Sequence, residues 1–141
     1  MGRDFRKITA WQRADDLTVK IYEVTKNFPK DEVYVLTSQL RRAAVSVPAN
    51  IAEGSSTSHK KEYLRFLYYA KSSLGEVDYY LHLARRLDYL STGSYEECFS
   101  MKEEAARTLQ GLIDAVTSEV RRLTSEVRSP KRNVCSLRSG V

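Results

Sequence analysis

Hydrophobic residues recur at spacings of three and four in four successive stretches of the chain, a pattern typical of helices that bury one face. These stretches cover about residues 10–27, 31–54, 58–90 and 94–124. Short polar connections separate them, and short connections make consecutive helices antiparallel. The pattern therefore predicts an all-α protein, an antiparallel four-helix bundle with up-down-up-down topology.

Each predicted helix has a stripe of apolar side chains that would face the core. The stripes are Trp11, Ala14, Leu17, Ile21, Val24 and Phe28; Val33, Leu36, Leu40, Ala43, Val47 and Ile51; Tyr63, Leu67, Ala70, Leu74, Val77, Leu81 and Ala84; and Cys98, Met101, Ala105, Leu109, Leu112, Val116, Val120 and Leu123. At a rise of 1.5 Å per residue, the third and fourth helices are ~50 Å and ~45 Å long, against ~27 Å and ~30 Å for the first two. The second hairpin should therefore overhang the first, or its ends must fray.

Polar residues and glycine mark the predicted helix ends. The segments TAWQ at residues 9–12 and SYEE at residues 94–97 match the capping box, in which the first and last side chains bond reciprocally to the backbone. Ser58 can cap the start of the third helix. Gly54 suits a left-handed cap at the end of the second.

Pro48 lies inside the second predicted helix. It has no N–H to donate to the Ala44 carbonyl and its ring crowds that group, so we expect a kink between Ala44 and Pro48 or a short break. Asn50 lies close by in the sequence. Its side-chain amide is a candidate donor to a carbonyl freed by Pro48.

The composition agrees with one helical domain. The chain has 141 residues, 42% of them hydrophobic, with six Gly and three Pro, too few for the many turns of a β-sandwich or barrel. No apolar run approaches the ~18 residues of a membrane span, and no apolar signal core follows Met1. We therefore expect a cytoplasmic protein with no membrane partner.

The net charge of +5 is concentrated at the two ends of the chain. Residues 1–7 carry +2, residues 125–141 carry +3, and the sequence between them is neutral. We expect a basic N-terminal arm over residues 1–8, the bundle over residues 9–124, and a disordered basic tail over residues 125–141.

Basic residues within the bundle occur in adjacent pairs, which favours local patches for a polyanion. The candidate nucleic-acid-binding residues are Arg41, Arg85, Arg86, Arg121, Arg122, Lys60 and Lys61. The alternative is that these pairs lie on solvated helix faces or form ion pairs between protomers.

The third helix carries more apolar surface than one core can cover. Six of the nine tyrosines lie between residues 63 and 89, and tyrosine suits protein interfaces because it buries a ring and keeps a hydroxyl. We therefore predict a homo-oligomer whose interface includes Phe66, Tyr68, Tyr69, Tyr79 and Tyr80. The alternative is that these rings cover the overhang within one protomer.

Arg42 and Glu53 lie on one helical stripe with Ser46 and Ala49, opposite the apolar stripe of the second helix. Eleven residues separate the two charges, roughly 16 Å along the axis, so they cannot pair with each other. We expect both to face a neighbouring subunit in a closed head-to-tail ring. Solvation, or pairing within the protomer, is the alternative.

The segment LTSQLRRAAVSVPANIAEG at residues 36–54 resembles the signature of the 23S rRNA intervening-sequence protein family. Trp11, the segment FPK at residues 28–30 and the segment KEYLRFL at residues 61–67 fit the same pattern. The resemblance implies a bacterial four-helix bundle assembled as a homopentamer and encoded with insertions in ribosomal RNA genes. It also implies a relation to the accessory variability protein of diversity-generating retroelements, which binds nucleic acid and assists a reverse transcriptase.

The sequence offers no arrangement typical of a catalytic or metal site. His59, His82, Cys98 and Cys135 lack metal-ligand spacing, and there is no phosphate-binding loop and no Glu-x-x-His pair of the di-iron bundles. We expect Cys98 to be a small core residue. We also expect no metal, no cofactor and no enzymatic activity.

Two functions remain open from the sequence. The first is a non-catalytic homo-oligomer, a pentameric ring by the resemblance, that binds nucleic acid, RNA in preference, through its paired basic residues. The second is a scaffold for a partner enzyme such as a reverse transcriptase, without direct binding of nucleic acid.

Overall fold

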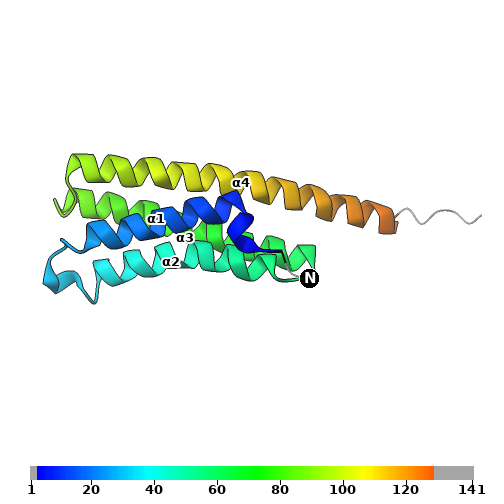
Figure 1. Cartoon of the computed structure of the whole chain (residues 1–141), viewed down its shortest axis with the longest axis horizontal. Helices are drawn as coiled ribbons and strands as arrows, with labels where there is room; N and C mark the ends of the chain where they lie inside the picture. The colour runs from blue at the N-terminus through cyan, green and yellow to red at the C-terminus, as the bar shows by residue number, and fades with distance from the viewer. Residues whose placement is uncertain (1–2, 129–141) are drawn as a thin grey trace, which may run out of the picture.

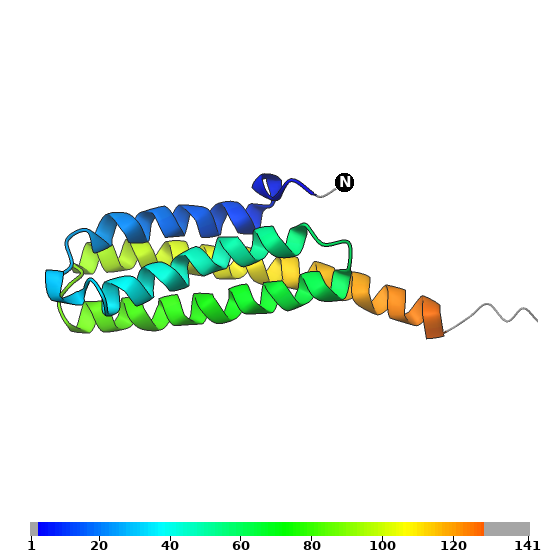
Figure 2. The same cartoon turned by 90° about the horizontal axis from the view of Figure 1, so that it is seen from below.

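The computed structural model describes residues 3–128, and all its regular structure is helical. The four long helices are α1 (Thr9–Thr25), α2 (Leu36–Ser55), α3 (Lys60–Arg86) and α4 (Thr92–Arg128). Two short 3₁₀ helices, η1 (Phe5–Lys7) and η2 (Lys30–Glu32), precede α1 and α2. Successive helices run antiparallel (Figures 1 and 2), which confirms the predicted four-helix bundle.

Each helix packs against two others, so the four enclose one core: α2 lies between α1 and α3, and α4 closes the bundle between α3 and α1. All seven residues of the predicted α3 stripe are buried. The predicted stripes of α1, α2 and α4 supply most of the remaining core. On α4, Leu112 was expected in the core but is only partly buried. The neighbouring Ile113 is buried instead, because the helix presents that position to the core.

The start of α1 differs from the predicted capping box. Ile8 occupies the cap position with no side-chain hydrogen bond, and Thr9 is already the first helical residue. The Gln12 side chain instead donates to the Arg6 carbonyl, at 2.8 Å. The 3₁₀ turn η1 comes directly before α1, and no side chain caps the helix start.

Pro48 does not interrupt α2, which is helical from Leu36 to Ser55, so the predicted alternative of a break is wrong. The Thr18 hydroxyl on α1 donates to the Ala44 carbonyl, at 3.0 Å. The Asn50 side chain donates to the Ser46 carbonyl, at 2.8 Å, and not to Ala44 as expected. A neighbouring helix therefore satisfies the carbonyl that proline leaves open.

Gly54 is not a left-handed cap, since none of the glycines in residues 3–128 has a positive φ. It is buried inside the last turn of α2, where an added Cβ would lie 2.8 Å from the Cβ of Phe66 and 2.9 Å from a ring carbon of Tyr63. Glycine is needed here because α2 and α3 approach closely. The last turn closes through the Ser55 and Ser56 hydroxyls, which donate to backbone carbonyls of the same turn.

The predicted caps of α3 and α4 are also displaced. His59, not Ser58, stands at the cap of α3. The helix α4 begins at Thr92, before the predicted Ser94, and the hydroxyl of Ser91 accepts the backbone N–H of Ser94 at 3.1 Å. Between the two helices Asp88 has φ of 60°, the left-handed conformation that turns the chain.

The fourth helix projects farthest from the bundle. The carboxyl-terminal part of α4 extends past the start of α3 and beyond the other three long helices (Figures 1 and 2). Most of the overhang predicted for the second hairpin belongs to α4, because α3 is shorter than expected, stopping at Arg86 rather than Leu90 and beginning after Ser58. Residues 125–128 continue the helix, and the rest of the predicted tail lies outside the described residues.

Candidate nucleic-acid interface

The bundle has two chemically different ends. We call the end with the α1–α2 and α3–α4 connections the loop end, and the end with η1, the α2–α3 connection and the projecting part of α4 the open end (Figure 2). Arg85 and Arg86 lie at the loop end, whereas Lys60, Lys61, Arg121 and Arg122 lie at the open end. The predicted cations therefore do not form one patch.

The open end is strongly basic. Residues 3–8, 58–62 and 119–128 together contain eight Lys and Arg and four Asp and Glu. Arg3 reaches this end, with its guanidinium carbon 5.8 Å from the centre of the Tyr63 ring at the start of α3. Three segments that are distant in the sequence thus place their positive charges around one end of the bundle.

Only some of these cations form ion pairs. The Lys60 ammonium lies 2.9 Å from the Glu119 carboxylate and holds the pKa of Glu119 below its usual value by hydrogen bonding to it. By contrast, Lys61, Arg121 and Arg122 are exposed, and within residues 3–128 none has a carboxylate at ion-pair distance. Lys60 is thus committed to joining α3 and α4, and the other three present charge to solvent.

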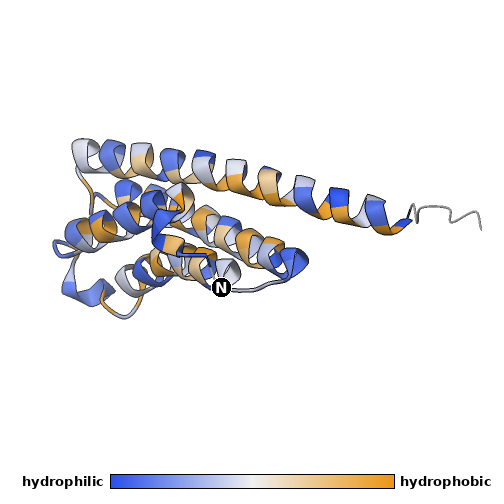
Figure 3. Cartoon of the chain, turned by 45° about the vertical axis from the view of Figure 1, so that its right-hand side comes forward, coloured by the Kyte–Doolittle hydropathy of each residue, from blue (hydrophilic) through white to orange (hydrophobic). Residues whose placement is uncertain are grey.

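A groove of about 490 Å³ runs between the start of α3 and the projecting part of α4. Lys60, Lys61 and Arg128 line it together with Leu123 and Val127. These two side chains are 46% and 80% exposed, although they continue the stripe that is buried farther back along α4. Figure 3 shows this hydrophobic stripe along α4 toward its carboxyl end.

Arg85 has a structural role at the loop end. Its guanidinium donates to the Thr92 hydroxyl at 2.8 Å, to the Leu90 carbonyl at 3.4 Å and to the Asp88 carboxylate at 3.3 Å. These bonds join the end of α3 to the start of α4. Its predicted role in binding nucleic acid stays a prediction, and the adjacent Arg86 is exposed.

Arg41 lies nearer the loop end, in a pocket of about 570 Å³ between the end of α1 and the start of α2. Its Nε donates to the Thr25 hydroxyl at 2.8 Å, and its guanidinium carbon lies 4.7 Å from the centre of the Tyr22 ring. Lys26, Lys30 and Arg42 also line this pocket. Of these four cations, the sequence pattern singled out only Arg41 as a binding residue.

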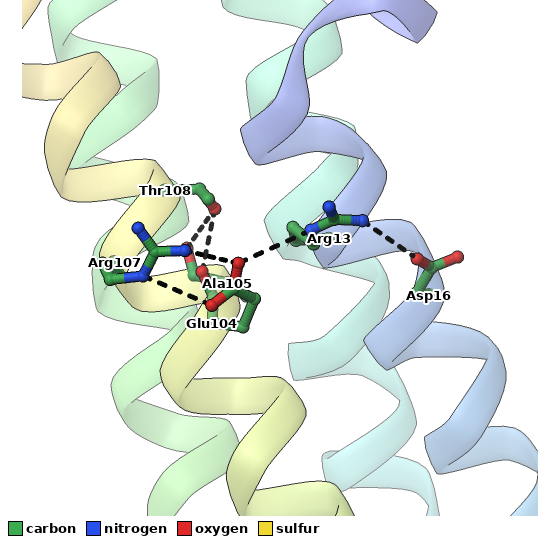
Figure 4. A network of polar contacts seen from close by, with 6 residues as sticks. All are labelled: Arg13, Asp16, Glu104, Ala105, Arg107 and Thr108. Atoms are coloured by element: carbon green, nitrogen blue, oxygen red, sulfur yellow. Dashed lines mark hydrogen bonds and ion pairs between the residues drawn. The ribbon is translucent and has the colours of Figure 1, made fainter.

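Other arginines are neutralised by carboxylates on the flank between α1 and α4. The Glu104 carboxylate lies 3.7 Å from Arg13 of α1 and 2.5 Å from Arg107 of its own helix (Figure 4). Arg13 is in addition 3.9 Å from Asp16. This flank is therefore a poor site for a polyanion.

The predicted interface residues of α3 are unequally exposed. Tyr68, Tyr69 and Tyr79 are roughly half exposed, whereas Phe66 and Tyr80 are half-buried, and Tyr80 packs against the core. The Tyr69 hydroxyl also accepts a hydrogen bond from Arg65, at 3.2 Å. The protomer thus covers part of the apolar surface of α3 that was predicted to be left over, and leaves three tyrosine rings exposed to solvent.

Arg42 and Glu53 are exposed on α2, and neither forms an ion pair within residues 3–128. The stripe between them is not wholly open, because the Ser46 hydroxyl lies 2.8 Å from that of Ser73 on α3. Their predicted contact with a neighbouring subunit remains a prediction.

Lys102 is a buried cation that the sequence pattern missed. Its ammonium lies 3.4 Å from Asp78 of α3, 4.4 Å from the centre of the Phe99 ring, and in contact with Glu103. Burial acts to lower the pKa of Lys102, but the hydrogen bond to Glu103 and the attraction of Asp78 raise it overall. The residue therefore stays charged inside the α3–α4 contact.

Cys98 is fully buried, as predicted for a core residue. Burial raises the pKa of its thiol to about 11, which keeps it protonated and unreactive. No helix within residues 3–128 is long and apolar enough to cross a bilayer, and no three potential metal ligands gather in that part of the chain.

The family model of the 23S rRNA-intervening sequence protein matches residues 6–111. The chain belongs to this family. The match covers α1, α2, α3 and the first half of α4, so the intervening-sequence core includes the Arg41 pocket, while Arg121 and Arg122 lie beyond the matched residues.

A solved structure supports the fold of this intervening-sequence protein. A protein with unknown function from the S23 ribosomal protein family of Bacteroides thetaiotaomicron is 23% identical, with a TM-score of 0.67, and the alignment covers 74% of this chain and 98% of that one. At this identity the likeness concerns the fold alone. None of the curated proteins is detectably similar in sequence to this chain.

Proposed function

We propose that this intervening-sequence protein is a non-catalytic homo-oligomer that binds structured RNA at its open end. The observation that carries the proposal is the projection of α4, which holds Arg121, Arg122 and Arg128 beyond the bundle and beside Lys61 of α3. Within residues 3–128 none of these four forms an ion pair with a carboxylate. Unpaired, exposed cations on a projecting helix can reach phosphates without steric hindrance from the bundle.

Oligomerisation would strengthen such a modest site. Several copies in a ring, five by the family resemblance, present several open ends to one RNA and act at high effective concentration. The exposed rings of Tyr68, Tyr69 and Tyr79 on α3 supply apolar surface for the contact between copies. The family name agrees with an RNA-linked role.

Salt-dependent binding of a fluorescent RNA hairpin tests the RNA part of this proposal. Replacing Arg121 and Arg122 by Gln should lower the slope of log affinity against log salt by about 0.9 for each phosphate that the variant no longer neutralises. The matched control replaces Arg13 and Arg107, which already pair with Asp16 and Glu104, and should leave the slope nearly unchanged. Absence of hairpin binding by the wild-type chain at low salt would contradict the proposal.

Light scattering coupled to gel filtration tests the assembly. We expect a multiple of 16.2 kDa, shifted toward smaller species when Tyr68 and Tyr79 are both replaced by Ser. A concentration-independent monomer of the wild-type chain would contradict the oligomer.

The groove lined in part by Leu123 and Val127 favours a second function, a scaffold that binds a partner protein such as a reverse transcriptase. Apolar side chains this exposed suit an interface with another protein better than contact with phosphate. Affinity purification from the native host, with and without nuclease, separates the two: a partner retained after nuclease favours the scaffold.

A further inference from the structure

We propose that the pocket between the end of α1 and the start of α2 binds a nucleotide unit, with the phosphate held by Arg41 and the base against the ring of Tyr34. The inference rests on the proposed function for the chemical class of the ligand, but it concerns a different surface from the open end. Four features of the pocket carry it.

The first feature is its charge. Four cations line the pocket, Lys26, Lys30, Arg41 and Arg42, and none of the twelve lining residues is acidic. Within residues 3–128 none of the four forms an ion pair. A concave surface with one sign of charge attracts an anion, and phosphate matches the planar fork of arginine.

The second feature is the fixed position of Arg41. Its Nε is bonded to the Thr25 hydroxyl at 2.8 Å, and its guanidinium stacks on Tyr22, with 4.7 Å to the ring centre. The two Nη groups have no hydrogen-bond partner among the described residues. Arg41 is therefore held in place through one nitrogen and one face, and the remaining N–H groups are available to an anion at little entropic cost.

The third feature is an unsatisfied hydroxyl. Thr37 lines the pocket, is only 5% exposed, and its Oγ1 has no hydrogen-bond partner in the described part of the chain. A buried polar group without a partner costs free energy, and a phosphate or ribose oxygen would supply one after a rotation of this side chain. Thr37 lies in the first turn of α2, where the helix dipole also favours an anion.

The fourth feature is the ring of Tyr34, which is 93% exposed although it borders the pocket. So exposed a ring contributes little to folding, whereas aromatic rings beside cations stack on unpaired bases. The volume of about 570 Å³ falls in the range of ~300–1,000 Å³ typical of small-ligand pockets. A nucleotide would bind all three groups: its phosphate the cations, a phosphate or ribose oxygen the Thr37 hydroxyl, and its base the Tyr34 ring.

The test measures binding of a fluorescein-labelled single-stranded oligouridylate to the full chain. Tyr34→Ser should weaken binding by roughly five- to 150-fold, the range expected when one base no longer stacks. Tyr34→Phe keeps the ring and removes only the hydroxyl, so it is the matched control and should bind like wild type. The double variant Lys26→Gln/Lys30→Gln should lower the salt slope by about 0.7 for each phosphate of the single strand that is no longer neutralised.

Competition identifies the source of the ligand. Displacement of the oligonucleotide by uridine monophosphate, reduced by Tyr34→Ser, supports a pocket that also accepts a free nucleotide. Binding of the oligonucleotide without such competition supports a pocket for one unit within a strand. Inorganic phosphate that competes as well as the nucleotide overturns the role of Tyr34.

Two results overturn the inference while leaving the proposed function intact. In the first, hairpin and single-strand binding depend on Arg121 and Arg122, but Tyr34→Ser and the lysine variants bind like wild type. In the second, Tyr34→Ser or the lysine variants change the mass measured by light scattering, which makes this surface a subunit interface. Binding of neither RNA by the wild-type chain removes both proposals.

Discussion

The hydroxyl of Thr18 on α1 donates a hydrogen bond of 3.0 Å to the carbonyl oxygen of Ala44 on α2. Pro48 lies four residues after Ala44 and has no N–H to offer to that carbonyl. The same hydroxyl lies 2.8 Å from the Ala14 carbonyl of its own helix, which fixes its position. α2 therefore tolerates an internal proline because a neighbouring helix replaces the missing donor.

Replacing Thr18 by Val should lower the free energy of unfolding by ~1–3 kcal/mol, because it leaves the buried Ala44 carbonyl without a partner. In a Pro48→Ala background the restored backbone N–H bonds to that carbonyl, so the same replacement should cost less. Urea unfolding of the four variants measures this coupling. An equal cost in both backgrounds would show that the hydroxyl does not compensate for Pro48.

Gly54→Ala should destabilise the bundle by ~1–3 kcal/mol, because the added Cβ would lie 2.8 Å from Phe66 and 2.9 Å from Tyr63. Gly111 is the matched control: it lies within α4, and an added Cβ meets nothing within 4 Å. Gly111→Ala should stabilise by about 0.5–1 kcal/mol through helix propensity. Thermal unfolding distinguishes the two, and a Gly54→Ala protein as stable as wild type would contradict the close approach of α2 and α3.

The Cys98 thiol should resist modification in the folded protein, because it is buried and its pKa is raised to about 11. In a Cys135→Ser variant, reaction with a chromogenic disulfide at pH 8 should be slow until denaturant is added. Since the unfolded thiol ionises near its ordinary pKa of 9.0 and the folded one near 11, stability should fall as pH rises through this interval. Cys98→Ala should weaken that pH dependence, and rapid labelling of the folded protein would contradict burial of the thiol.

Arg85→Ala should cost about 1 kcal/mol of stability, a value reduced for the partial exposure of the side chain, because it removes the bonds to Thr92 and the Leu90 carbonyl. The adjacent Arg86 is exposed, and Arg86→Ala should change stability by less than ~0.5 kcal/mol. Chemical denaturation of both variants checks the difference. Equal effects would contradict a special role of Arg85 in the α3–α4 turn.

The helices could be predicted from the sequence because the apolar residues that they bury recur at spacings of three and four. The α3 stripe from Tyr63 to Ala84 is buried as the spacing of its apolar residues indicates. The caps could not be predicted in the same way, because a polar side chain near a helix start competes with backbone turns such as η1. Gly54 looks like a cap in sequence, and only its contact with α3 reveals its role.

The sequence could indicate single candidate residues of the sites, but not which of them lie together in space. Whether a cation is available depends on carboxylates from other helices, as with Lys60 and Glu119, which are 59 residues apart in sequence but 2.9 Å apart in space. The α1–α2 pocket likewise joins Lys26 and Lys30 to Arg41, and its unsatisfied hydroxyl has no sequence signal. Which cations are paired and which residues share a pocket depends on contacts between helices, and the sequence of each segment does not contain this information.

The projecting part of α4 also determines how a polyanion can approach it. The last four carbonyl groups of any helix lack helical donors and give its carboxyl end a partial negative charge. Arg128 lies in that last turn and offsets part of this charge, whereas Arg121 and Arg122 lie nearly two turns earlier. Since Arg121 and Arg122 lie along the flank of this rod, a strand of phosphates that contacts both should cross α4 broadside rather than meet it end-on.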